Sequence, residues 1–279
     1  LAAIIALVRS GGDLFTVTQP IGRVAGTVFG VLIYLTIGPL FAIPRTTTVS
    51  FEVGVAYFLG DGQVALFIYS IIYFALVILI ALYPGRLIDT VGKYMTPVLV
   101  AALLILGGYA VLVPADAVGL GNELYRDAPL SRGFLQGYLT MDGLAGLVFG
   151  IVIVNAIRDR KIDNPALQTR YALIAAVIAA TGLALVYLSL VYLGATSNSV
   201  APEADTGAVI LAEYMQYSFG VGGHVLLAVV ITLACLTTAI GLTTACGEYF
   251  SRLLPLSYRT IVITFGVFSL VVANQGLER

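Results

Sequence analysis

The sequence predicts an all-α integral membrane protein, a multi-span helical bundle that forms a single transmembrane domain over residues 1–279. Of the 279 residues, 59% are hydrophobic and only 10% are charged, and the mean hydropathy is +1.01. A soluble domain carries about 25% charged residues because its surface must contact water. A soluble enzyme is therefore excluded, and the net charge of −1 leaves no basic surface for nucleic acid.

Seven apolar segments follow one another along the chain. They lie at residues 24–57, 64–83, 95–113, 138–158, 171–194, 224–250 and 258–275. About 20 apolar residues cross a bilayer as a helix, and only helices satisfy their own backbone in lipid. The first and sixth segments are longer than the bilayer requires and should tilt or protrude. Residues 1–8 are interpreted as the end of an eighth, truncated span.

The basic residues orient these segments. Ten of the 14 Lys and Arg residues fall in the loops 9–23, 84–94, 158–170 and 251–259. Because short cytoplasmic loops carry an excess of Lys and Arg, these four loops should lie in the cytoplasm. The orientation then alternates correctly across every segment.

A short internal echo relates two of the segments. Residues 42–47 (AIPRTT) and 239–244 (AIGLTT) are identical at four of six positions, and their helices should run in opposite directions. Inverted repeats are typical of transporters, although a match of six residues also arises by chance.

The first segment is unusually polar for a membrane span. It contains Pro39, Pro44, Arg45, Thr48 and Glu52, and a charge at the centre of a span costs about 2.5–3.5 kcal/mol. In one interpretation, Glu52 lies in the outer headgroup region and Arg45 is paired locally. The sequence favours the alternative, in which Arg45, Thr48 and Glu52 form a polar path or gate.

The fourth segment begins with a polar, small-residue stretch, GYLTMDGLAG, at 137–146. It predicts a broken helix near Asp142, whose exposed ends offer backbone groups to a charged substrate. The alternative is that Asp142 only begins a helix after a loop.

The sixth segment contains five threonines, among them Thr237 and Thr238. Their hydroxyls either bond carbonyls of their own helix or serve as oxygen ligands for sodium, and the residues alone favour the first. His224 is interpreted as an interface residue. The sequence contains no catalytic or phosphate-binding motif, so neither an enzyme nor a cofactor is expected.

Several stretches closely resemble the branched-chain amino acid transport system II carriers, the bacterial cation symporters of the LIVCS family. The most specific is GPLFAIPRTTTVSFE at 38–52, and the others are LYPG at 82–85, GYLTMD at 137–142, VFGIVIVNA at 148–156 and PLSYRT at 255–260. The resemblance covers the chain from end to end. It implies a multi-pass protein of the bacterial plasma membrane, with a partial LeuT-type fold of two inverted helix repeats.

The resemblance also implies roles for individual residues. Leucine, isoleucine or valine would be bound by Thr140, Met141, Asp142, Gly143, Leu144, Ala145 and Gly146, with Phe149 as a side-chain wall of the pocket. Sodium would be bound by the carbonyl of Ala234 and the hydroxyls of Thr237 and Thr238. The opposing sodium ligands would come from helix one of the fold, which by this resemblance is expected to lie outside this sequence, as are the C-terminal helices.

The expected function is import of branched-chain amino acids by symport with sodium, with protons as the other possible coupling ion. The alternative is a carrier of another small solute, either proton-coupled or like the major facilitators. The turn 85–93 (GRLIDTVGK) resembles a facilitator loop motif, but it is short.

Overall fold

The computed structural model describes residues 5–7, 10, 17–60, 62–83, 93–119, 125, 127–140, 142–162, 164–202, 204 and 206–275. Within these residues every regular element is a helix, and six helical stretches are long and apolar enough to cross a membrane. The helix α14 (Tyr258–Asn274) is also apolar but has 17 residues. The prediction of an all-α, multi-span membrane bundle is confirmed.

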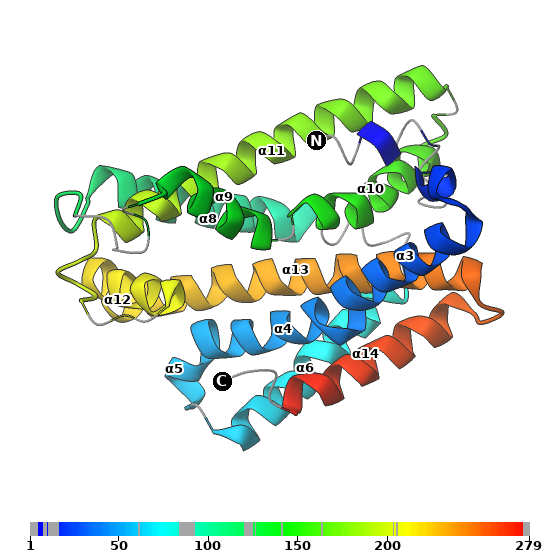
Figure 1. Cartoon of the computed structure of the whole chain (residues 1–279). Coiled ribbons are helices and arrows are strands. Elements are labelled where there is room, and N and C mark those ends of the chain that lie inside the picture. Colours follow the sequence, from blue (N-terminus) through cyan, green and yellow to red (C-terminus); the bar gives the residue numbers. More distant parts are fainter. Residues whose placement is uncertain are drawn as a thin grey trace.

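The helix α13 (Val221–Leu253) lies at the centre of the bundle. Figure 1 shows it between two groups of helices. One group consists of α3 (Arg23–Leu35), α4 (Ala42–Val49), α5 (Ala56–Leu59), α6 (Gln63–Ala81) and α14. The other consists of α8 (Thr96–Leu112), α9 (Pro129–Leu139), α10 (Asp142–Asp159) and α11 (Pro165–Ala195), while α12 (Gly207–Phe219) lies at one end. The short 3-10 helix η1 (Gln19–Ile21) precedes α3. The main core cluster is formed largely by α13 with its neighbours, and Ala239, Ile240 and Cys246 are fully buried in it.

The first long segment is one helical stretch, Arg23–Leu59, that is interrupted twice. The π-helical segments η2 (Thr36–Leu40) and η3 (Ser50–Val55) separate α3, α4 and α5. Gly38 has non-helical backbone angles (φ −87°, ψ −123°), directly before Pro39. Proline and π-bulges are the usual causes of helix kinks, and both are present at this position.

Neighbouring helices supply polar partners for the carbonyls around this kink. The Cys246 thiol donates to the Tyr34 carbonyl at 3.4 Å, and the Ser269 hydroxyl donates to the Pro39 carbonyl at 3.5 Å. Such partners are needed because an unsatisfied backbone group in the apolar interior is costly. Cys246 and Cys235 are both free thiols.

The helix α11 has 31 residues and begins earlier than the predicted segment at 171–194. The side chain of Asn164 caps it by accepting from the Ala166 amide at 3.0 Å, and Pro165 is its first residue. Proline suits this position because its missing N–H has no helical partner there. This helix therefore joins the first and sixth segments in exceeding the length that a bilayer requires.

Candidate functional site

The predicted break in the fourth segment lies between two helices. The helix α9 ends at Leu139, Thr140 follows as its C-cap, and α10 begins at Asp142. Met141 lies outside the described residues. Residues 137–139 are helical and not a loop, while Asp142 is the first residue of α10, as the alternative interpretation expects. The carbonyl end of α9 and the N–H end of α10 meet at this point, with opposite partial charges.

Two hydroxyl groups surround the carboxylate at this break. Oδ2 of Asp142 lies 2.9 Å from the Thr140 hydroxyl and 2.9 Å from the Tyr187 hydroxyl of α11. The Thr140 hydroxyl also lies 2.6 Å from the carbonyl oxygen of Gly137. The side chain of Asp142 is thus positioned by α9 and α11 as well as by its own helix.

A cavity of about 530 Å³ opens at the break. It is lined by Phe134, Gly137, Tyr138, Leu139, Asp142, Gly143, Leu144 and Leu147. Small-molecule sites are typically 300–1,000 Å³, mostly apolar, with a few placed polar groups. Of the predicted substrate residues, Asp142, Gly143 and Leu144 line this cavity, whereas the other described members of the set, Phe149 included, do not line it.

The predicted cation residues lie together on one turn of α13. The hydroxyls of Thr237 and Thr238 donate to the carbonyl of Ala234 at 2.9 and 2.8 Å. Each hydroxyl thus bonds a backbone carbonyl in the preceding turn of its own helix. It also brings two hydroxyl oxygens and one carbonyl oxygen within a single turn, and Thr238 is exposed there.

The helices α10 and α13 pack in a parallel register that relates these two groups. The ring of Phe149 lies against Gly241, and the amide of Asn155 donates to the carboxylate of Glu248. The residue numbers of the two partners differ by 92 in the first pair and by 93 in the second. The two helices therefore run in the same direction. Continued toward the start of α10, the same offset places Asp142 at the level of Ala234. The cavity at the break therefore lies at a similar depth in the bundle to Ala234, Thr237 and Thr238, which together form the threonine turn.

Substitution of Gly241 by alanine should force these helices apart. A Cβ atom at this position would lie 2.6 Å from Cε1 of Phe149, far inside van der Waals contact. Overpacking of this kind costs about 1–3 kcal/mol, so we expect a lower midpoint of thermal unfolding in detergent. Gly241→Ala combined with Phe149→Leu should recover most of the loss. Gly108→Ala is the control, since nothing lies within 4 Å of its Cβ position. A normal midpoint for Gly241→Ala alone would contradict the packing.

The residues of the predicted polar path, Arg45, Thr48 and Glu52, make local contacts. The guanidinium of Arg45 lies 5.4 Å from the centre of the Phe41 ring, and the Thr48 hydroxyl donates to the Arg45 carbonyl at 3.1 Å. Arg45 and Glu52 are both exposed. This geometry favours the local interpretation of Arg45, and its role as a gate stays a prediction.

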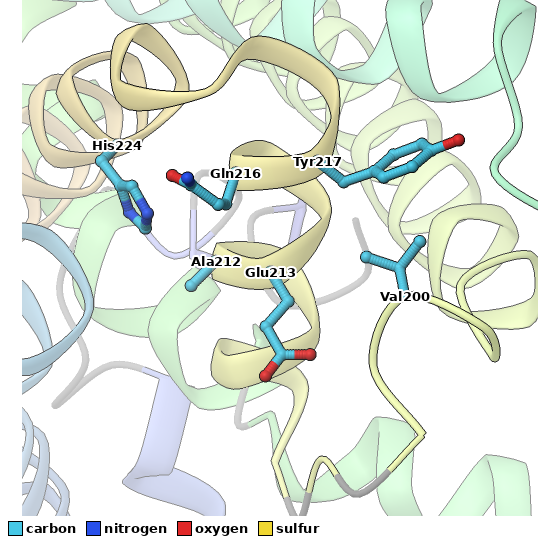
Figure 2. Close-up of a pocket in the computed structure, with 6 residues that line it drawn as sticks. All are labelled: Val200, Ala212, Glu213, Gln216, Tyr217 and His224. Carbon is cyan, nitrogen blue, oxygen red and sulfur yellow. The ribbon is translucent and has the colours of Figure 1, made fainter.

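A second cavity, of about 360 Å³, lies at the predicted outer end of the bundle. It is lined by Val200, Ala212, Glu213, Gln216, Tyr217 and His224. In Figure 2 the side chains of Glu213, Gln216 and Tyr217 leave α12 in different directions, with His224 on the Gln216 side. Its polar groups do not converge on one point. His224 stacks on Tyr57 with ring centres 3.8 Å apart, as a residue that joins two helices does.

Comparison with known proteins supports the sequence resemblance over the whole chain. The family described as "Branched-chain amino acid transport protein" matches residues 1–279. The chain belongs to this family. The family is one of transport proteins rather than enzymes, as the sequence predicts.

Individual members of the branched-chain amino acid transport protein family are highly similar to this chain. The branched-chain amino acid transport system 2 carrier protein of Pseudomonas aeruginosa is 62% identical over 279 residues, which cover 100% of this chain and 64% of the relative. The permease BrnQ of Escherichia coli K12 is 50% identical over 276 residues, covering 99% and 63%. The permease BraB of Bacillus subtilis is 44% identical over 282 residues, covering 100% and 63%. The chain thus spans a little under two thirds of the length of these relatives. No solved structure matches it, and the inverted-repeat arrangement stays a prediction.

Sequence reasoning missed one polar pair in this family member, Asn155 and Glu248. Both side chains are half-buried, and they join α10 to α13. The available signal was the carboxylate of Glu248 within the predicted span 224–250, because an ionisable residue inside a span is a functional candidate by default.

Proposed function

We propose that this chain contributes to the substrate and cation sites of a plasma-membrane carrier that imports leucine, isoleucine and valine by symport with sodium. The observation that supports it most directly is the register of α10 on α13, from which the cavity at the helix break and the threonine turn are expected at a similar depth in the bundle. The printed names of the relatives, carriers and permeases of branched-chain amino acids, supply the substrate class.

The helix break offers complementary groups for both charges of an amino acid. The ammonium group would pair with the carboxylate of Asp142 and the carbonyl end of α9, and the substrate carboxylate would face the N–H groups at the start of α10. Phe134, Leu144 and Leu147 line the same cavity and would contact a branched aliphatic side chain. Burial of that side chain contributes about 1.5–3 kcal/mol.

The threonine turn would bind sodium through the oxygens of Ala234, Thr237 and Thr238. On sodium binding, both hydroxyl protons would turn away from the Ala234 carbonyl and leave three oxygens facing the cation. Three oxygens on one turn do not surround a cation, and the sequence resemblance places the remaining ligands on helix one. Sodium binding would stabilise the state that accepts substrate, which couples the two affinities reciprocally.

The decisive experiment is leucine uptake into proteoliposomes that contain a full-length carrier with this chain. Uptake should follow an inward sodium gradient at fixed pH and be competed by isoleucine and valine. Uptake that follows a pH gradient without sodium would overturn the threonine site and favour proton coupling through Asp142 or Glu52. Absence of uptake of all three amino acids, from a folded sample, would overturn the substrate assignment. The facilitator-like turn 85–93 lies almost wholly outside the described residues, and no observation favours that alternative.

A further inference from the structure

A polar pair joins α10 to α13 near the predicted cytoplasmic end of the seam between these helices. The side-chain amide of Asn155 donates a hydrogen bond to Oε2 of Glu248. One turn before Asn155, Ile151 is only 3% exposed and belongs to the same buried cluster as Leu242 and Ala245 of α13, and Phe149 packs on Gly241 just beyond it. Apolar packing therefore closes the seam, and the polar pair lies at its end.

The position of this pair relates it to transport rather than to packing alone. A carboxylate within a membrane span is costly and is retained where it has a partner or a task. Here it joins the helix that begins at the substrate cavity to the helix that carries the threonine turn. Alternating access requires that one helix group move against another about a fixed site. Release toward the cytoplasm would then require the inner end of this seam to open.

We propose that Asn155 and Glu248 are positioning residues that form a clasp, closed in the outward-facing carrier and parted when it opens to the cytoplasm. The inference rests on the proposed function for its place in a transport cycle. A hydrogen bond to an ionised group is stronger than one between neutral groups. It is also reversible, because water can hydrate both partners once the seam opens.

The experiment measures how fast a cysteine buried in the seam reacts with a thiol reagent from the cytoplasmic side. Ile151→Cys serves as the reporter in a full-length carrier with Cys235→Ala and Cys246→Ser, since serine keeps the donor to the Tyr34 carbonyl. Inside-out vesicles are treated with a membrane-impermeant reagent. Asn155→Asp places two carboxylates opposite each other and should raise the labelling rate about tenfold, as expected for loss of one hydrogen bond to a charged group.

The double variant Asn155→Asp/Glu248→Gln is the critical test. It restores the hydrogen bond with donor and acceptor exchanged, so labelling should return close to the rate of the unmodified pair. Val262→Cys, fully buried on α14 against Gly247 of α13, is the control reporter and should be unaffected by Asn155→Asp. In the unmodified pair, addition of sodium should slow labelling of Ile151→Cys, which a bond with a purely structural role would not show.

Three results would overturn the clasp. They are an unchanged rate in folded Asn155→Asp, a double variant that labels as fast as Asn155→Asp, and an equal rise at Val262→Cys. Labelling that ignores sodium in a carrier with sodium-driven uptake would also overturn its place in the cycle. A failure of the proposed function is distinguishable from a failure of the clasp. Leucine uptake would then be absent, while the labelling rate of Ile151→Cys would still differ between the variants.

Discussion

Replacement of both Thr237 and Thr238 by alanine is expected to raise the sodium concentration for half-maximal leucine uptake by about a hundredfold. Each lost oxygen contact to the cation is comparable to a hydrogen bond to a charged group, so two contribute about 3 kcal/mol. The leucine affinity at saturating sodium should change much less, because the cavity at the helix break retains all its lining residues. The measurement is leucine uptake into proteoliposomes over a series of sodium concentrations at fixed pH.

The helix itself should tolerate this change. In the structure both hydroxyls bond the carbonyl of Ala234, and alanine has a higher helix propensity than threonine. Thr181→Ala on α11 is the matched control, because its hydroxyl makes the same type of bond, to the carbonyl of Val177 at 2.9 Å. It should leave the sodium dependence unchanged. If the double variant behaves like Thr181→Ala, the threonines only bond their own helix and the sodium site lies elsewhere.

The fold could be predicted from hydropathy to the level of a helix bundle. Long apolar segments must become helices in lipid, whatever packs against them. The earlier start of α11 was also available in the sequence, since Asn164 followed by Pro165 is a recognised helix start. The break before Asp142 is indicated locally, by a carboxylate flanked by Thr140 and small residues in the outer third of a predicted span.

The relation between helices could not be predicted in the same way. Nothing in the local sequence of α10 states which residue of α13 opposes Phe149, because that register results from side chains meeting across two segments. The pairing of Asn155 with Glu248 depends on the same register and was missed for the same reason. From the sequence alone, Asp142 and Thr237 can only be assigned to separate segments. The packing of Phe149 on Gly241 is what relates the depth of Asp142 in the bundle to that of Thr237.

Replacement of Asp142 by asparagine is expected to lower kcat/KM for leucine by about 10–100-fold. The substitution keeps the size of the side chain and removes the negative charge proposed to pair with the substrate ammonium, which contributes about 1.5–3 kcal/mol. Tyr187→Phe should have a smaller effect, about fivefold, because it removes one donor at 2.9 Å and leaves the carboxylate in place.

The control for charge is Asp116→Asn, in the loop after α8. Its carboxylate accepts from the Ser199 amide at 2.7 Å, and hydrogen bonds from the side chain and backbone of Ser199 lower the pKa of Asp116. Asp116 is thus a hydrogen-bonded carboxylate that does not line the cavity at the helix break. Uptake by Asp116→Asn should be normal. A loss equal to that of Asp142→Asn would mean that negative charge in general, rather than the group at the break, supports uptake.

A leucine exchange assay distinguishes two roles for the Asp142 carboxylate, which are binding the substrate ammonium group and carrying a coupling proton. Preloaded proteoliposomes exchange internal for external leucine without net movement of a coupling ion. If Asp142 binds the ammonium group, Asp142→Asn must impair exchange and gradient-driven uptake alike, because each needs bound substrate. If Asp142 instead carries a proton through the cycle, the variant would keep exchange and lose only gradient-driven uptake. The cavity lined by Asp142, Leu144 and Leu147 leads us to expect the loss of both, together with weaker leucine binding to the purified carrier at saturating sodium.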